Sequence, residues 1–265
     1  MNCNCCGSTE GNVDSHVISR FIRMAITGMV GTSGVKFRFQ WCGRKDLPRQ
    51  DLPKPKLLCE SCDNDFGVRI EKPASKILLP TGDISEVCNW ECLPYIQREM
   101  PFLVGGHSFK VGEYQIDDDD DDFALRRFSV LTAWRALHAM REEGNSEVNR
   151  FLDSEDGQRL QSETVDFLGR PEASGYMHFP YLATLYLLGP YSAAAISGSD
   201  DEVPFAWAFI QSKGQSGVAV LLGFWAIIWP LLPDGDPRRN SIELQRGTFV
   251  DWHAQVVRQL RLSTE

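Results

Sequence analysis

Four cysteines arranged as two widely separated C-x-x-C pairs constrain this sequence more than any other feature. The pairs are Cys3 with Cys6 and Cys59 with Cys62. Thiolate ligation of zinc requires this spacing, because each tight turn presents two sulfurs on the same side of the backbone. The chain opens without a basic segment followed by an apolar run, so we expect no secretory signal, a cytoplasmic localisation and reduced thiols.

The first pair leaves one assignment open, because Cys5 could replace Cys3 or Cys6 as a ligand. Gly7 favours Cys6, since a glycine at that position lets the backbone turn toward the sulfurs. Four thiolates leave no coordination position for water or substrate. We therefore predict a structural zinc ion held by Cys3, Cys6, Cys59 and Cys62.

The segment between the two pairs contains one predicted strand and one predicted loop. Residues 35–41 alternate apolar and polar side chains, as a half-buried strand does, and residues 47–55 contain three prolines. Two cysteine turns that bracket a strand and a loop are typical of a treble clef. We predict an α+β protein with a small ββα-type treble-clef zinc module in residues 1–72. A larger mixed helical and β domain follows in residues 73–265, and residues 71–75 mark the boundary.

The larger domain is predicted from its apolar runs. Residues 123–140 form a mostly apolar helix, and the six aspartates of residues 117–122 precede it as a solvated lead-in that complements the helix dipole. The other predicted elements are a short helix within residues 90–100, a polar helix over residues 146–168, strands within residues 203–210 and 218–229, and a closing helix over residues 249–260.

Two apolar stretches raise the alternative of membrane insertion. Residues 218–232 fall short of the roughly 20 residues that a spanning helix needs, and Gly189-Pro190 interrupts residues 181–195. We therefore expect no membrane association.

The net charge of −9 is distributed unevenly along the chain. Residues 1–72 contain 11 Lys and Arg against 8 Asp and Glu, a balance of +3, whereas the remainder contains 16 against 28, a balance of −12. Contacts with phosphate are therefore expected from residues 1–72, and the acidic remainder suits a protein partner better than a nucleic acid.

The residues around the two cysteine pairs resemble the zinc-containing HNH endonucleases. In that family a first C-x-x-C-G precedes a histidine and two aliphatic residues, as Cys3 to Gly7 precede His16-Val17-Ile18. The segment Ser15-His16-Val17-Ile18-Ser19-Arg20-Phe21 looks like the Ser-His-Ile-Ile-Pro-Lys-Phe signature of a bacterial HNH-like group. That group also has an apolar helix ending in Trp-Arg, which residues 129–135 resemble.

The resemblance implies a metal-dependent nuclease that hydrolyses phosphodiester bonds of nucleic acid. The expected partner of residues 1–72 is nucleic acid, with DNA favoured over RNA. His16 would be the general base, and Asp63 would help to hold a catalytic Mg²⁺ or Mn²⁺ ion. Gln50 would orient the base, because no asparagine lies between Asn12 and Asn64 to do so.

Several positions also depart from the family pattern. Ser15 stands where active enzymes have an Asp or His, Ser19 replaces the proline, and Asp63 replaces the last histidine. The alternative prediction is therefore a catalytically degenerate zinc module that binds nucleic acid or a protein partner.

Overall fold

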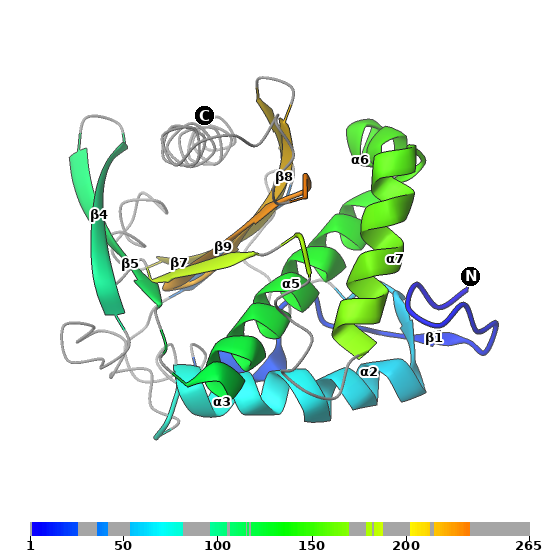
Figure 1. Ribbon diagram of the computed structural model, residues 1–265, viewed down its shortest axis with the longest axis horizontal. Coiled ribbons are helices and arrows are strands. Elements are labelled where there is room, and N and C mark those ends of the chain that lie inside the picture. The colour runs from blue at the N-terminus through cyan, green and yellow to red at the C-terminus, as the bar shows by residue number, and fades with distance from the viewer. Residues whose placement is uncertain are drawn as a thin grey trace.

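The structure of the chain is a computed structural model, shown in Figure 1. It describes residues 2–25, 36–41, 54–81, 96–104, 107–114, 116, 118–169, 179–181, 183–187, 202–212 and 215–233. Besides helical residues 20–25, the helices are α2 (Glu60–Phe66), the π-helical turn η1 (Gly67–Glu71), α3 (Lys72–Leu78), α5 (Asp119–Glu142), α6 (Ser146–Leu152) and α7 (Glu155–Gly169). The strands are β1 (Asn12–Val13), β2 (Lys36–Trp41), β3 (Leu58–Cys59), β4 (Ile96–Val104), β5 (His107–Tyr114), β6 (Thr184–Leu187), β7 (Glu202–Ser212), β8 (Gln215–Leu222) and β9 (Trp225–Pro230). This mixture of helices and strands confirms the predicted α+β class.

Seven strands form one sheet in the order β2-β7-β8-β9-β6-β5-β4, and β1 and β3 form a separate two-stranded ladder. Neighbours in the large sheet are antiparallel except β2 and β7, which pair in parallel from Lys36 with Glu202 to Trp41 with Trp207. The strand predicted from the alternation in residues 35–41 is therefore confirmed. Strand β2 pairs with β7, so this segment of residues 1–72 is part of the large sheet.

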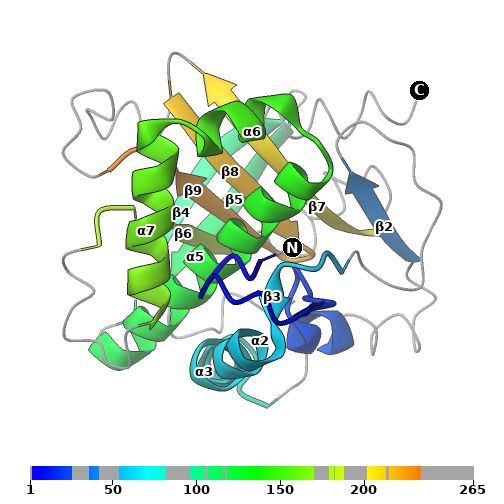
Figure 2. The ribbon, with the colours of Figure 1, turned by 90° about the vertical axis from the view of Figure 1, so that its right-hand side faces the viewer.

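Helix α5 lies across the sheet and is the centre of the fold (Figure 2). It contacts β6, β7, β8 and β9 on one side and α3, η1, α6 and α7 on others. All residues from Arg127 to Met140 are buried, which explains why the predicted apolar helix shows little amphipathicity. Asp118 caps its first turn by accepting from the N–H groups of Asp120 and Asp121 at 3.0 Å each, as expected of an acidic lead-in.

Helix α2, the turn η1 and helix α3 follow one another without a break over residues 60–78. The boundary predicted at residues 71–75 therefore falls inside a helical run. Buried side chains on both sides of it, such as Phe66, Ala74 and Trp134, belong to one continuous apolar core. Among the described residues, nothing separates a small module from a larger domain at this point.

Two predicted helices in the larger part are wrong in detail. Residues 96–100 belong to β4, which pairs with β5 at the edge of the sheet, where Pro101 costs no central hydrogen bond. The helix predicted over residues 146–168 is two helices. Helical structure is interrupted at Asp153–Ser154. The Ser154 hydroxyl oxygen accepts from the N–H of Gly157 at 3.2 Å and so caps the start of α7.

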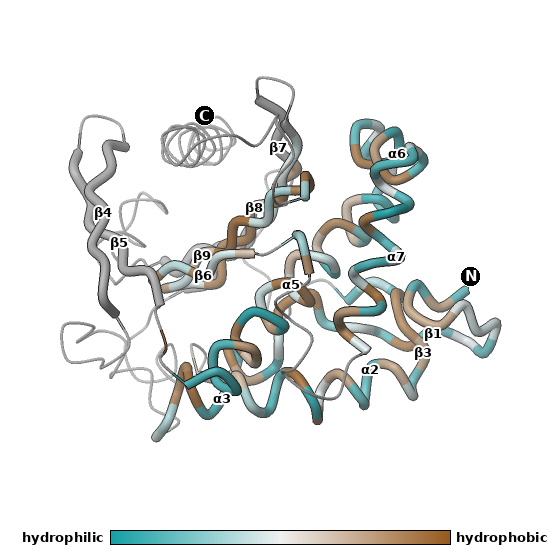
Figure 3. The backbone as a smooth tube through the Cα atoms, in the orientation of Figure 1, coloured by the Kyte–Doolittle hydropathy of each residue, from teal (hydrophilic) through white to brown (hydrophobic). Residues whose placement is uncertain are grey.

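The apolar residues 218–229 form β8 and β9 at the centre of the sheet, and Figure 3 shows the apolar character of β8 in brown. Trp225 and Trp229 are fully buried there. Within the described ranges, no helix combines the length and the apolar character that crossing a bilayer requires. The predicted closing helix over residues 249–260, Gln50 and most of the predicted loop over residues 47–55 lie outside the described residues.

Candidate metal centre

The four predicted cysteine ligands come together in space. The Sγ atoms of Cys3, Cys6, Cys59 and Cys62 all lie within 4.8 Å of one another. The Sγ atoms of Cys6 and Cys59 are 3.7 Å apart. A tetrahedral zinc ion with bonds of about 2.3 Å separates its sulfurs by about 3.8 Å, so this spacing fits. The four cysteines could hold a metal such as zinc.

The two-stranded ladder brings the cysteine pairs together across a long stretch of chain. Asn12 in β1 pairs with Cys59, and Val13 pairs with Leu58. The N–H of Asn4 donates to the carbonyl oxygen of Leu57 at 3.0 Å, which places the first turn directly beside β3. Cys59 ends β3 and Cys62 lies in the first turn of α2, so the second pair is positioned by a strand-to-helix junction.

The first turn depends on a glycine in a left-handed conformation. Gly7 has φ of 72°, and its N–H donates to the carbonyl oxygen of Cys3 at 2.9 Å. This conformation is nearly free of strain only for glycine. The turn that places Cys6 beside Cys59 therefore depends on Gly7, which agrees with the choice of Cys6 over Cys5.

Backbone donors point at the first sulfur of each pair. Burial opposes ionisation of Cys3, but N–H groups of Cys6, Cys59 and Cys5 donate to its sulfur and bring its pKa to about 7. The N–H of Cys62 donates to the sulfur of Cys59 in the same way. N–H donors of this kind favour the thiolate, the form that binds metal.

The remaining thiols crowd one another. Burial and then the charge on Cys5 raise the pKa of Cys62, and burial raises the pKa of Cys5 to about 11. At Cys59 the donor from Cys62 lowers the pKa, but burial and the neighbouring sulfurs outweigh it. Several thiolates within a few ångströms repel each other. A divalent cation would remove that repulsion, so the donor set suits one.

His16 and Asp63, the predicted catalytic residues that the structure describes, do not belong to a second cluster of metal-ligating side chains. His16 is half-buried, just beyond β1, and the N–H of its neighbour Ser15 donates to the carbonyl oxygen of Pro55 at 3.0 Å. Asp63 follows Cys62 in α2 and pairs with Arg135, with Nη2 3.0 Å from Oδ1. Among the described residues, the four cysteines are the only group of three or more metal-ligating side chains.

Two further carboxylates beside the cysteine pairs also lie apart from each other. Asp65 binds Arg69, whose Nε donates to Oδ1 at 2.5 Å, and this hydrogen bond lowers the pKa of the Asp65 carboxyl. Asp14 is exposed and lines a pocket on the outer side of β1. Asp63, Asp65 and Asp14 therefore lie in three different surroundings.

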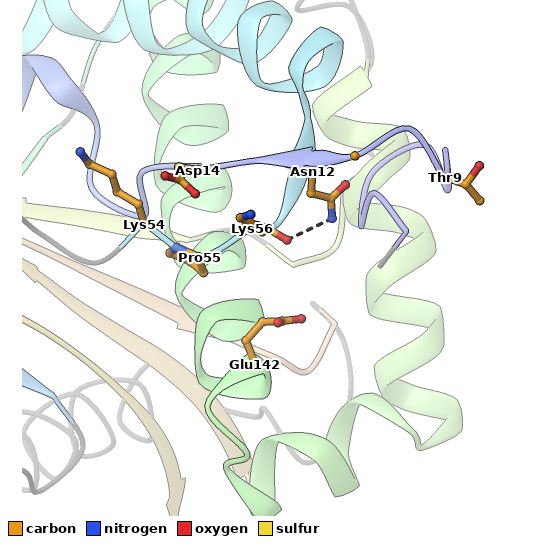
Figure 4. A pocket seen from close by; sticks show the side chains of 8 residues that line it. Thr9, Asn12, Asp14, Lys54, Pro55, Lys56 and Glu142 are labelled. Carbon is orange, nitrogen blue, oxygen red and sulfur yellow. Dashed lines mark hydrogen bonds between the residues drawn. The ribbon is translucent and has the colours of Figure 1, made fainter.

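The pocket beside Asp14 has a volume of about 590 Å³ and opens between β1, the segment before β3 and the end of α5 (Figure 4). Its ionisable lining side chains are Asp14, Lys54, Lys56 and Glu142. Two positive and two negative groups balance. The pocket therefore has no charge preference for phosphate or for a cation.

Sequence reasoning missed the side chains that attach the cysteine turns to the helices. The sequence marks Arg135 only as part of a Trp-Arg pair, yet its side chain binds both Asp63 and Glu71. The Gln161 side chain in α7 donates from Nε2 to the carbonyl oxygen of Asn4 at 2.8 Å. An arginine within a helix predicted to be buried is a sequence signal for such a contact, because a buried charge needs a partner of opposite charge. Nothing in the sequence marks Gln161.

No protein-family model, curated protein or solved structure matches this chain.

Proposed function

We propose that the protein is a zinc-binding protein with an HNH-like treble-clef module. One structural zinc ion would be held by Cys3, Cys6, Cys59 and Cys62. The observation that carries this proposal is the mutual distance of the four sulfurs, all within 4.8 Å. A turn bearing the first pair, a two-stranded ladder and a helix bearing the last ligand are the parts that a treble clef needs.

Metal analysis of the purified full chain tests this proposal directly. We expect one zinc ion per chain, released by a strong chelator with loss of structure around the two cysteine turns, because the crowded thiolates repel one another without a cation. Cys59→Ser should reduce zinc content sharply, whereas Cys5→Ser should retain it. A wild-type chain that binds no zinc after reconstitution would overturn the proposal.

We further propose that the module binds nucleic acid without cleaving it. Support comes from two carboxylates near the cysteine turns. Asp63 forms an ion pair with Arg135, and Asp65 forms one with Arg69, which leaves both carboxylates poorly suited to hold a catalytic cation. The +3 balance of residues 1–72 suits contact with phosphates. Binding should weaken as salt rises, with no turnover in Mg²⁺ or Mn²⁺. Cleavage that depends on His16 would overturn this part of the proposal.

Nuclease activity is the second candidate, and the position of His16 favours it. The half-buried His16 follows β1, which pairs with the strand that carries Cys59, as the HNH resemblance implies for a general base. In this reading Asp63 and Gln50 assist, and Mg²⁺ or Mn²⁺ supplies charge at the scissile phosphate. His16→Ala would abolish cleavage of DNA while retaining zinc. Equal cleavage by His16→Ala and wild type would exclude it.

A further inference from the structure

The side chain of Gln161 in α7 joins the first cysteine turn to the helices that cover the sheet. Its Nε2 atom donates to the main-chain oxygen of Asn4 at 2.8 Å. The two residues are separated by 157 positions in the chain, so the N-terminal turn cannot form this contact by folding on its own. It forms only when α7 is packed against the cysteine turns.

Two donors from α5 fix the orientation of the Gln161 amide. The indole Nε1 of Trp134 donates to Oε1 at 2.8 Å, and Nε2 of His138 is also 2.8 Å from Oε1. An indole N–H can only donate, so the amide oxygen must face Trp134, and His138 must carry its proton on Nε2. The Gln161 NH₂ group is therefore directed at Asn4 before any ligand binds.

Asn4 lies inside the first C-x-x-C pair, between Cys3 and Cys5. Its N–H donates to Leu57, and its carbonyl oxygen accepts from Gln161, so both of its peptide groups are held. Cys6, the only exposed member of the four, comes two residues later. A peptide held on both sides restricts how far the Cys6 sulfur can move away from its partners.

We propose that Gln161 is a positioning residue for the metal centre, which holds the Asn4 peptide so that Cys3 and Cys6 retain the ion. This inference rests on the proposed zinc binding. Groups that orient metal ligands through a hydrogen bond typically change metal affinity by about tenfold to a hundredfold when they are lost. The helical layer, through α7, thereby sets how long the N-terminal turn keeps its metal.

Gln161→Glu in the full chain separates the two roles of the side chain. Glutamate keeps an oxygen for Trp134 and His138 but has no N–H for Asn4. We expect zinc transfer to a chromogenic chelator to be about tenfold to a hundredfold faster than in wild type. Gln161→Met, which removes every hydrogen bond at similar volume, should release zinc at least as fast. Either variant serves if the other fails to fold.

Two controls distinguish positioning from general stability. Gln158→Glu makes the same chemical change at an exposed position of α7 and should release zinc at the wild-type rate. Leu152→Ala, at the buried last position of α6, should lower the melting temperature without speeding zinc release. If wild type binds zinc and Gln161→Glu releases it at the wild-type rate, the inference is wrong. If wild type binds no zinc, the proposed function fails and this inference falls with it.

Discussion

Arg135 and Asp63 form an ion pair that joins the centre of α5 to the helix bearing the second cysteine pair, with 3.0 Å between Nη2 and Oδ1. The Nη1 atom of the same guanidinium binds Glu71 in η1. The Arg135 side chain is only 3% exposed. A buried guanidinium with two carboxylates fixes α2 and η1 against the core helix.

Replacement of Arg135 by methionine should destabilise the protein strongly. Methionine keeps an apolar side chain of similar length but leaves the carboxylates of Asp63 and Glu71 without a cation. Breaking a fully buried pair costs about 3–5 kcal/mol, and partial exposure of both carboxylates reduces this to about 2–3 kcal/mol. Urea unfolding at pH 7 measures the change.

Arg141→Met is the matched control on the same helix. Arg141 pairs with Asp153 at 3.0 Å, but both side chains are exposed, 44% and 66% respectively. Exposed pairs contribute little, so the control should change the free energy of unfolding by less than about 1 kcal/mol. If Arg135→Met and Arg141→Met lowered the free energy of unfolding equally, the buried ion pairs of Arg135 would contribute no more than an exposed pair.

Gly7→Ala should weaken the first cysteine turn through backbone strain alone. Gly7 has φ of +72°, and no atom lies within 4 Å of where a Cβ would be placed. Holding an alanine in the left-handed region costs about 1–2 kcal/mol. Zinc affinity should fall by the corresponding factor of about tenfold, measured by chelator competition. Gly11→Ala, where space is also open and φ is not left-handed, should keep wild-type affinity.

The cysteine pairs could be predicted from sequence because the signal is local. Ligand spacing within each C-x-x-C pair follows from a tight turn, and Gly7 next to Cys6 marks that turn. The central helix could also be predicted from the sequence, because a long apolar run after an acidic cap is typical of a buried helix.

Contacts between segments far apart in the sequence could not be predicted from it. Residues 36–41 read correctly as a strand, but nothing in them indicates that they pair with residues 202–207 of the large sheet. The break between α6 and α7 did leave a signal, since Ser154 followed by Glu155 and Asp156 is typical of a helix start. Helical periodicity continued across it and concealed the cap.

Gly157→Ala should disrupt the junction between α6 and α7. A Cβ at Gly157 would lie 2.1 Å from the carbonyl oxygen of Phe151 and 2.7 Å from the Cα of Leu152. Both are backbone atoms, so the two helices would have to separate, at a cost of about 1–3 kcal/mol or more. Thermal unfolding measures this. Gly169→Ala at the other end of α7 meets open space and should leave the melting temperature nearly unchanged.

Protonation of His138 should reduce stability in mild acid. Burial, together with the nearby Arg141, lowers the pKa of His138 to about 4, although the hydrogen bond with Gln161 opposes the shift. The unfolded chain, with a histidine pKa of about 6.5, therefore binds more protons than the folded chain between these two values. The contribution of His138 is fully present above about pH 6.5 and declines as the pH falls toward about 4.

The size of the effect follows from linkage, and His138→Gln isolates it. Between pH 7 and pH 5 wild type should lose about 2 kcal/mol more of its unfolding free energy than His138→Gln, which has no group to protonate there. Acid also protonates the thiols that would bind zinc, but it does so in both proteins, so only the difference between them reports on His138. Urea titrations at the two pH values measure that difference. Parallel losses in the two proteins would mean that His138 is already protonated, or accessible to water, in the folded chain.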